Sequence, residues 1–451
     1  MHKRRFRQFV IGALACVSLA CAASAFALAP HAAHADALTV DSAQDWAELL
    51  SSDEVRLESD LVVTYPLEGF DGVFDGQGHT IRCEGAAFAS LSGRVQNVKF
   101  EGDTAIDGGD GVILNCVASG GLAVGFEGQI VASYAGKKLE GDTSYCVAPA
   151  FSDAGEGDTV RYHNAFNAKE VAELLERSRI AASCAYGYNF AELNAHLPGL
   201  SFGEKGYAFA GLGEEWEPYR ISSAWEMAYL SAYVNGGEDF EGVSFLQTCD
   251  IDFASFGTLC PIGRSDTERG FCGVYDGNGY ALFNLNIDTS FGSVDNALFG
   301  RLGGFVYNLG IESGKIAGGS CASFAAVGMA GREPLIANCY SRATIAGEWR
   351  SGGIADNYNG AIENCWAYHF NRYPLVSYAA ARIENCYSNG QIVSGTAEVV
   401  DCKTVSRGEL NGEDCVEALS DYSLRLAMKR GGGALAWTRG ALFPELTRTK
   451  G

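Results

Sequence analysis

The stretch Ile336-Ala337-Asn338-Cys339 returns downstream as Ile362-Glu363-Asn364-Cys365 and Ile383-Glu384-Asn385-Cys386, and ends in the variant Val399-Val400-Asp401-Cys402. From Asn338 onward, the Asn or Asp positions are 26, 21 and 16 residues apart. These spacings are too short for separate domains and too irregular for a coiled coil, but they suit the stacked repeats of a solenoid. The repeat therefore predicts the fold class before any single residue is considered.

The same phrase occurs earlier in the chain, where an aliphatic residue again precedes Asn by two positions. Its copies are Val95-Gln96-Asn97-Val98, Ile113-Leu114-Asn115-Cys116 and Val306-Tyr307-Asn308-Leu309. Short strands that cannot bury a face alone stack in parallel, about 4.8 Å apart. We expect each Asn to form a corner in a left-handed conformation, which Asn tolerates, so that the aliphatic residue and the Cys both face inward. Stacked Asn side chains can then hydrogen-bond from repeat to repeat.

A longer repeat indicates a tandem duplication. The matching segments are residues 40–49 with 221–230, and residues 69–78 with 270–279, the second pair at a constant offset of 201 residues. We therefore predict a first unit over residues 36–220 and a second over residues 221–451.

Helix signals flank these repeats. Ser42 and Ser223 each stand three positions before an acidic residue, Asp45 and Glu226, at the start of an apolar run. This is a capping-box pattern, more convincing at Glu226, and it predicts short helices that cover strand edges at the ends of the stack. Another helical stretch over residues 414–428, followed by a Trp-containing segment over residues 437–444, is expected to close the second unit.

Gly-rich stretches next to the Asn phrases resemble GLUG motifs, the repeats of bacterial secreted and cell-surface proteins. These stretches are Ala325–Gly331 with Ile336–Cys339, and Gly352–Asp356 with Ile362–Cys365. Residues 70–78 and 271–279 are similar to the segment that commonly precedes such motifs, and the resemblance covers most of residues 38–146 and 221–402. It implies an all-β fold, a tandem right-handed parallel β-helix (solenoid) with short α-helical caps, in an extracellular setting. The resemblance does not imply a catalytic site.

The N-terminus over residues 1–35 is typical of a signal peptide. A basic start at Lys3–Arg7 precedes an apolar run from Phe9, and Ala33–Ala35 suits cleavage. We expect a secreted protein, with attachment to the cell surface or an uncleaved N-terminal anchor as alternatives. No other segment is apolar enough to span a bilayer, so no membrane contact is expected beyond the signal sequence.

The charge excludes some partners. The chain has 55 acidic and 33 basic residues, a formal net charge of −22, and the predicted signal peptide contains none of the acidic ones. Nucleic acid is therefore not expected as a partner, because the field of the protein repels phosphate. A glycan or a host or cell-surface protein is the expected partner, and no cofactor is predicted.

Catalytic patterns are weak. His-Glu-x-x-His is absent, so no zinc or other metal site is expected. Gly199–Gly203 matches the Gly-x-Ser-x-Gly motif of serine hydrolases around Ser201. That motif requires a helix directly after it, and no helix pattern follows here.

Carboxylates remain the other catalytic option, because some parallel β-helices carry polysaccharide-cleaving enzymes. Asp71, Asp75 and His79 cluster in sequence, and Asp250, Asp252 and Asp276 could cluster in space. Since Asp75 and Asp276 occupy the same Gly-rich corner of each copy, we expect them to hydrogen-bond local backbone.

Fifteen Cys occur, and two of them lie in the predicted signal peptide, which leaves an odd number. For the repeated Cys339, Cys365, Cys386 and Cys402, parallel stacking keeps Cβ atoms about 4.8 Å apart, beyond the 3.5–4.5 Å that a disulfide prefers. We therefore expect buried thiols there rather than a disulfide ladder. Cys249, Cys260 and Cys272, outside the phrases, are better disulfide candidates.

Tyr340, Trp366 and Tyr387 directly follow three of these Cys. If the thiols face inward, the rings face outward in a line, either as a stabilising aromatic ladder or as a docking strip for a glycan or protein. The sequence thus predicts an exported, non-catalytic, adhesin-like or glycan- or protein-binding protein. The alternative is a polysaccharide lyase or glycoside hydrolase on the same scaffold.

Overall fold

The computed structural model describes most of the chain beyond the predicted signal peptide. The described residues are 37–49, 54–135, 142–144, 146–149, 160–162, 176–184, 209–289, 295–370, 372–430 and 435–448. The predicted signal peptide over residues 1–35 and the pentapeptide Gly199–Gly203 lie outside them.

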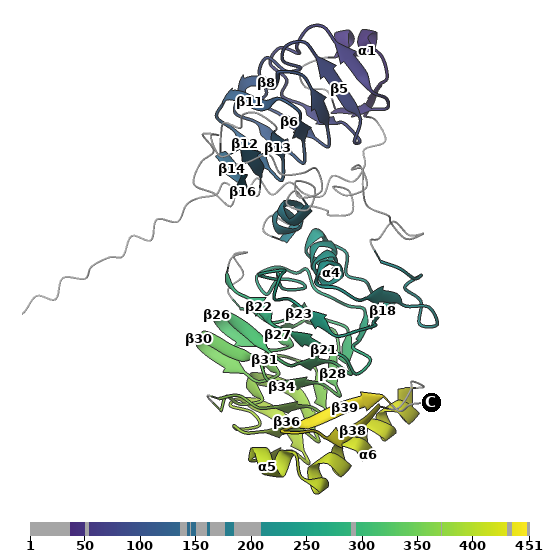
Figure 1. Cartoon of the computed structure of the whole chain (residues 1–451), viewed down its shortest axis with the longest axis vertical. Helices are drawn as coiled ribbons and strands as arrows, with labels where there is room; N and C mark the ends of the chain where they lie inside the picture. The colour runs from purple at the N-terminus through teal and green to yellow at the C-terminus, as the bar shows by residue number, and fades with distance from the viewer. Residues whose placement is uncertain are drawn as a thin grey trace, which may run out of the picture. The chain divides into compact units, whose positions relative to one another are not determined.

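The described chain is all-β with parallel sheets and few helices, which confirms the predicted class (Figure 1). In the first half, one sheet has the order β1 (Leu38–Val40), β2 (Glu54–Leu57), β4 (Val73–Asp75), β6 (Arg94–Gln96), β9 (Val112–Leu114), β12 (Gln129–Val131) and β14 (Asp142–Ser144). The second sheet comprises β3 (Leu61–Val63), β5 (Thr80–Cys83), β7 (Lys99–Glu101), β10 (Val117–Ala118), β13 (Tyr134–Ala135), β15 (Val147–Pro149) and β16 (Val160–Tyr162), and a two-stranded sheet pairs β8 (Thr104–Gly109) with β11 (Gly121–Phe126). Strands thus pair with their counterparts in neighbouring repeats.

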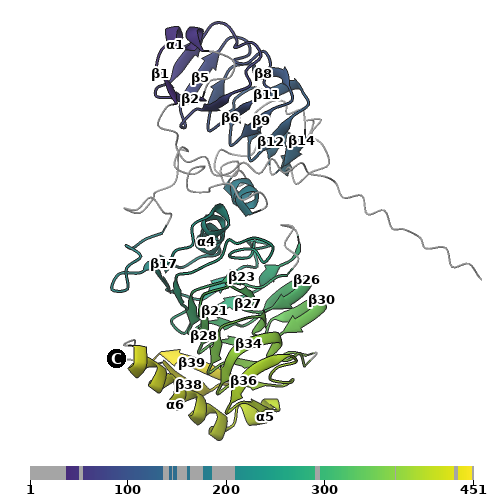
Figure 2. The same ribbon diagram turned by 180° about the vertical axis from the view of Figure 1, so that it is seen from behind.

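The second half repeats this plan with separate sheets (Figure 2). Its largest sheet has the order β17 (Tyr219–Ile221), β18 (Ser244–Gln247), β20 (Val274–Asp276), β24 (Phe305–Tyr307), β28 (Leu335–Ala337), β32 (Ala361–Glu363), β34 (Val376–Glu384), β31 (Ala355–Asn357), β27 (Ala325–Gly328) and β23 (Phe299–Leu302), with β36 (Thr396–Val400) beside β34. Another contains β19 (Ile251–Asp252), β21 (Ala281–Phe283), β25 (Gly310–Ile311), β29 (Tyr340–Ser341), β33 (Trp366–Ala367), β35 (Tyr387–Ser388) and β37 (Lys403–Thr404), and the third contains β22 (Leu285–Ile287), β26 (Gly314–Ala322) and β30 (Thr344–Gly352).

The repeated Asn residues are the corners between the first two sheets of each half. Asn97, Asn115, Asn308, Asn338, Asn364 and Asn385 all have φ between 48° and 58°. This left-handed turn lets the residues on either side of the corner face inward, and both Ile362 and Cys365 are fully buried. Ile362 stands in register between Ile336 and Ile383, so the aliphatic residues of successive repeats stack in one core. The predicted corner conformation is confirmed.

Helix α1 (Ala43–Glu48) and helix α4 (Ala224–Gly236) begin where the capping patterns predict. Ser42 and Asp45 form the complete reciprocal box. At α4, Ser223 accepts from the Glu226 N–H (3.3 Å), but the Glu226 carboxylate accepts from the Ser222 N–H (2.6 Å). The expectation that the box is more convincing at Glu226 is therefore wrong, because that carboxylate reaches one residue beyond the cap.

The C-terminal segment combines helix α5 (Arg407–Leu410), helix α6 (Glu413–Arg430) and an antiparallel hairpin of β38 (Leu435–Arg439) and β39 (Pro444–Arg448). The helix expected over residues 414–428 is present as α6. Residues 176–184 are also helical. None of the helices in the described part of the chain combines the length and apolar character needed to cross a lipid bilayer.

Candidate binding groove

The corner amides of the second half form a continuous hydrogen-bonded ladder. Asn308 Nδ2 donates to Asp276 Oδ1 (2.9 Å), and Asn338 Nδ2 donates to Asn308 Oδ1 (3.0 Å). Asn364 Nδ2 donates likewise to Asn338, and Asn385 Nδ2 donates to Asn364 Oδ1 (2.6 Å). The amides all donate toward Asp276, so their dipoles align and end on a carboxylate. The predicted stacking of Asn338, Asn364 and Asn385 is confirmed.

Helix α6 covers the later part of this ladder. Asn338 Nδ2 also donates to Ser423 Oγ (2.8 Å), and Asn364 Nδ2 donates to the Leu419 carbonyl (2.9 Å). Each of these amides thus uses one N–H within the ladder and the other toward the helix. The ladder therefore also holds α6 in place through hydrogen bonds, a role that the repeat pattern did not predict.

The first half has a shorter ladder among its described residues. Asn97 Nδ2 donates to Asp75 Oδ1 (3.0 Å), and Asn115 Nδ2 donates to Asn97 Oδ1 (2.7 Å). Asn115 Oδ1 then accepts from Arg179 Nε (2.9 Å). Burial lowers the pKa of this guanidinium to about 10. The next corner is Ala132, whose φ of 49° shows that it takes an Asn position without an amide.

Asp75 and Asp276 hold local backbone, as expected. Asp75 Oδ1 accepts from the Gln77 N–H (3.0 Å), and Asp276 Oδ1 accepts from the Asn278 N–H (2.8 Å). His79, considered above with Asp71 and Asp75, lies beside another carboxylate. His79 Nδ1 lies 3.6 Å from Asp60 Oδ1. No group of three or more His, Cys, Asp or Glu in the described residues could hold a metal ion.

Asp250 and Asp252 lie apart from Asp276, contrary to the cluster considered above. Asp250 Oδ1 accepts from the Ala281 N–H (2.9 Å), and Asp252 Oδ1 accepts from Asn284 Nδ2 (2.8 Å). Both line a hollow of about 280 Å³ that Asp276 does not reach. The short strand β19 places them at a different corner of the repeat.

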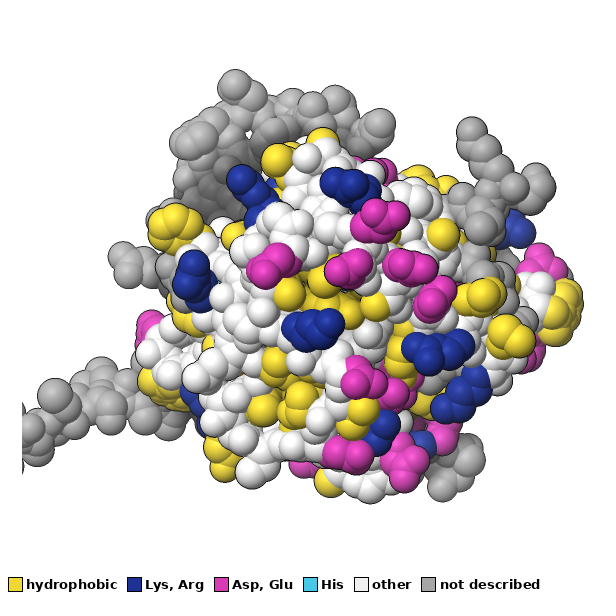
Figure 3. Space-filling view, turned by 90° about the horizontal axis from the view of Figure 1, so that it is seen from below, with side chains coloured by type: hydrophobic (Ala, Val, Ile, Leu, Met, Phe, Trp, Pro, Cys, Tyr) yellow, Lys and Arg dark blue, Asp and Glu magenta, His cyan; other side chains and the backbone are white. Residues whose placement is uncertain are grey.

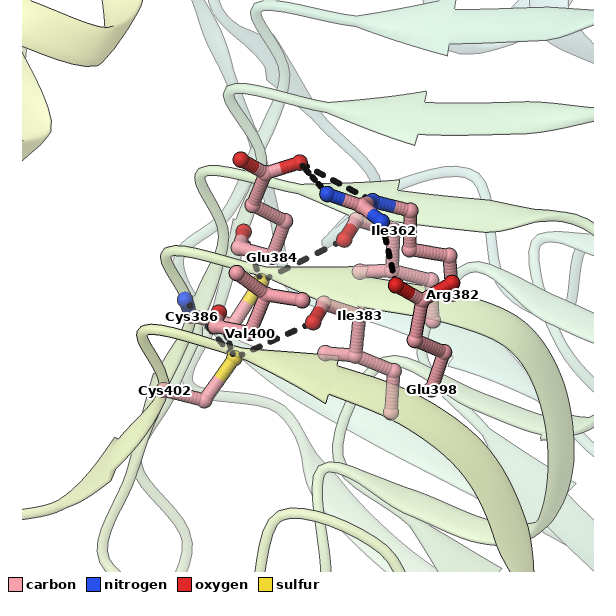
Figure 4. Close-up of polar contacts among 8 residues, drawn as sticks. All are labelled: Ile362, Arg382, Ile383, Glu384, Cys386, Glu398, Val400 and Cys402. Atoms are coloured by element: carbon pink, nitrogen blue, oxygen red, sulfur yellow. Dashed lines mark hydrogen bonds and ion pairs between the residues drawn. The ribbon is translucent and has the colours of Figure 1, made fainter.

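The repeated thiols form a column in which Cys339, Cys365 and Cys386 are buried and Cys402 is half-buried. Figure 4 shows its last two members, Cys386 and Cys402. The Cys365 N–H donates to Cys386 Sγ (3.3 Å), and the Cys386 N–H donates to Cys402 Sγ (3.3 Å). Cys386 Sγ contacts the Ile362 carbonyl (3.6 Å), so each sulfur has backbone partners in its neighbours. Burial raises the pKa of Cys365 and Cys386. The predicted column of thiols is confirmed.

All thirteen Cys beyond residue 35 are free thiols in the structure. The expectation of a disulfide among Cys249, Cys260 and Cys272 is therefore not met, because each has other neighbours. Cys249 Sγ contacts the Ser222 carbonyl (3.1 Å), and Cys272 Sγ lies 3.4 Å from Met329 Sδ.

Tyr340, Trp366 and Tyr387 align, but the prediction that these rings face solvent is wrong. Trp366 and Tyr387 are 0% and 2% exposed. Tyr340 stacks on Trp366 with ring centroids 4.8 Å apart, and Phe443 stacks on Trp366 at 5.6 Å. These rings form an apolar row, one ring per repeat, and burial of such a row is favourable. The C-terminal hairpin and α6 pack over the row and bury it. The row is thus a packing surface for the chain's own C-terminal segment.

A groove of about 360 Å³ lies on the outer face of the largest sheet, beside the Asp276 end of the ladder. Strands β18, β20, β24 and β28 form its floor, and α6 and the turn before Pro218 form its walls. The lining residues are Glu215, Pro218, Ser244, Phe245, Leu246, Val274, Asp276, Tyr307, Asn308, Ala337, Asn338, Ser423, Leu426 and Ala427. This volume lies within the range of small-ligand sites.

Two exposed apolar side chains lie next in sequence to lining residues of the groove. Trp216, next to the lining residue Glu215, is 74% exposed in a tight turn where Glu214 and Glu217 pair. Met428, next to Ala427 on α6, is 78% exposed. An exposed ring in the segment next to the groove is available to stack on a ligand. Sequence patterns could not show this site, because its walls come from residues 215–218 and from α6, which are far apart in the chain.

The groove is acidic. Its described lining contains two carboxylates, Glu215 and Asp276, and neither Lys nor Arg. Elsewhere, opposite charges are interspersed: Arg382 bridges Glu384 (2.9 Å) and Glu398 (2.6 Å), and the face in Figure 3 mixes acidic and basic side chains. The groove therefore favours neutral or cationic groups over anions.

An alignment over 155 residues, which covers 32% of the chain, shows 30% identity to part of halomucin from Haloquadratum walsbyi (strain DSM 16790 / HBSQ001), and the match spans 2% of that protein's length. No family model matches the chain, and no solved structure matches it. These comparisons establish similarity to a small part of one large protein and no family membership.

Proposed function

We propose that this chain is an exported, non-catalytic protein that presents an extended surface and binds a glycan in the groove beside Asp276. The groove carries this proposal, because its mixed lining includes Asp276, Asn308 and Asn338 and its volume suits one or two sugar units. The exposed indole of Trp216, next in sequence to the lining residue Glu215, is available to stack on a bound sugar. Its carboxylates favour a neutral or amino sugar over an acidic one.

The scaffold in this proposal is a tandem right-handed parallel β-helix of the GLUG-resembling kind. Its support is the parallel pairing of counterpart strands and the amide ladder through successive corners. A rigid stack of repeats suits surface presentation, because each repeat adds area without a new core. Secretion, with attachment to the cell surface as the alternative, remains part of the proposal.

Glycoside hydrolysis is the second candidate, because the groove contains the pair Glu215 and Asp276. It is the weaker one. Asp276 Oδ1 already accepts two hydrogen bonds, and Glu215 stands exposed on a turn, whereas a general acid is usually held in an apolar environment.

A glycan array with residues 36–451 tests binding. We expect neutral or amino sugars to bind, and Trp216→Ala to weaken binding at least about tenfold, which corresponds to about 1.4 kcal/mol. Trp349→Ala is the matched control, because Trp349 is 69% exposed on β30 and, unlike Trp216, has no lining residue of the groove next to it in sequence. Equal binding by Trp216→Ala and wild type would place the site elsewhere.

The same glycans, incubated with the protein and assayed for released reducing ends, separate the two candidates. We expect no release by the wild type. Release that is lost in Glu215→Gln would establish the hydrolase.

A further inference from the structure

Two of the free cysteines lie together in the interior although 76 residues separate them in sequence. Cys184 ends the helical stretch over residues 176–184, and Cys260 lies between β19 and β20. Their exposed fractions are 0% and 2%.

One amide contacts both sulfurs. Asn235 Nδ2 lies 3.7 Å from Cys184 Sγ and 3.6 Å from Cys260 Sγ. Ser231 Oγ, one turn earlier on α4, lies 3.6 Å from Cys184 Sγ. Burial raises the pKa of Cys260, and the neighbouring Cys184 raises it further.

The thiol column offers a contrast. There, Cys386 and Cys402 belong to parallel repeats, whose spacing of about 4.8 Å exceeds the Cβ separation of a disulfide. Cys184 and Cys260 come from a helix and a loop, so no strand register holds their Cβ atoms apart. Rotation about the Cα–Cβ bonds is then enough to vary the distance between the sulfurs.

We propose that Cys184 and Cys260 form a disulfide when the chain folds in contact with a disulfide donor, either a thiol–disulfide oxidoreductase or oxidised glutathione. The thiolate of one Cys attacks the donor disulfide and releases one donor thiol. The other Cys, deprotonated in turn, attacks the mixed disulfide, forms the Sγ–Sγ bond and releases the second donor thiol. The two Cys lose two electrons and two protons, and the donor gains them.

The timing follows from burial. A buried, poorly ionised thiol is a weak nucleophile, so the exchange takes place during folding, before the interior closes. The product ties residues 176–184 to the second half through Cys260. The proposal is independent of the groove, and although export would bring the chain to such a donor, the test below does not require export.

Refolding residues 36–451 from denaturant in a glutathione redox buffer tests the pairing. Free thiols are then blocked, and peptides are mapped by mass spectrometry without reduction. We expect a peptide pair that joins Cys184 to Cys260, with the column thiols Cys339, Cys365 and Cys386 blocked as free thiols. Recovery of Cys184 and Cys260 as blocked thiols, or joined to other cysteines, would overturn the proposal.

Variants separate the crosslink from simple packing. Under oxidising conditions, Cys184→Ser and Cys260→Ser should each lower the unfolding midpoint by roughly 5–10 °C. Reductant should lower the wild-type midpoint by a similar amount and leave both variants unchanged. Cys249→Ser, with no cysteine partner in the structure, should keep the wild-type response to reductant. A wild-type midpoint that does not respond to reductant contradicts the crosslink.

Discussion

The two halves of the molecule form the same corner, but different groups complete the hydrogen bonds of the corner amides. In the second half, α6 satisfies the remaining amide N–H of Asn338 and Asn364. In the first half, Arg179 donates to the last amide, Asn115, and Ala132 follows at the next corner. The comparison shows that the repeat phrase encodes the corner, whereas segments outside the repeats complete its hydrogen bonding.

The two halves also differ at the position two residues after each corner. Tyr340, Trp366 and Tyr387 pair side by side on β29, β33 and β35, and the C-terminal segment buries them. The counterparts in the first half are Lys99, Val117 and Tyr134, which pair on β7, β10 and β13. A cover forms where the position carries large rings, because burial of aromatic area supplies its stability.

Removal of the central ring should have the largest effect. We expect Trp366→Ala to lower the free energy of unfolding by about 4 kcal/mol, because it leaves a cavity beneath Phe443 and Trp437. The matched change in the first half, Val117→Ala, should cost about 1 kcal/mol, because Val117 is only half-buried. Denaturant unfolding measures both. A similar small loss for the two variants would mean that the cover does not depend on the ring stack.

Loss of a ladder amide should have the next largest effect. Asn364→Ala removes contacts to Asn338, Asn385 and α6 and puts Ala at positive φ, which together should cost about 3 kcal/mol. Asn364→Gly relieves the backbone strain, and its difference from Asn364→Ala isolates that part. A cost below about 1 kcal/mol for Asn364→Ala would show that the ladder contributes little to stability.

Acid should affect the second half through His369, with a smaller effect. Its ring is buried, with Nδ1 2.8 Å from the Ala343 carbonyl, and burial lowers the pKa of His369 below the usual 6.5. The unfolded chain therefore takes up the proton first, so this stability is complete above about pH 6.5 and is lost as the pH falls toward the folded pKa. Between pH 7.5 and 5, the free energy of unfolding should fall less steeply with decreasing pH for His369→Gln than for the wild type. An equal slope in the variant rules out the buried ring as the cause.

The smallest effect should come from the corner that lacks an amide. Ala132→Gly should stabilise the first half by about 0.5–1 kcal/mol, because glycine adopts positive φ without the Cβ penalty, although it adds unfolded-state entropy. Thermal unfolding of wild type and variant measures the gain. Ala118→Gly, in the neighbouring strand β10, is the control and should destabilise. A loss of stability in Ala132→Gly would mean that this corner is not strained.

Much of the fold was predictable because its signal is periodic. The phrase around Asn364 recurs, so one corner conformation explains six Asn positions, and the thiol column follows from the same spacing. The groove was not predictable, because the segments around Glu215 and Leu426 that form its walls belong to no repeat. The exposure of Trp366 was predicted wrongly for a related reason: a row of outward rings indicates an apolar stripe but not what covers it.

The sequence by itself determined the parallel stacking, the left-handed Asn corners and the inward thiols, because each depends on residues within one repeat and its copies. Only the tertiary structure decided that α6 lies on the amide ladder, that the C-terminal hairpin buries the ring stack, and that a groove stays open beside Asp276. These outcomes depend on contacts between segments far apart in the chain, where shape and hydrogen-bonding demand, rather than local periodicity, select the partner.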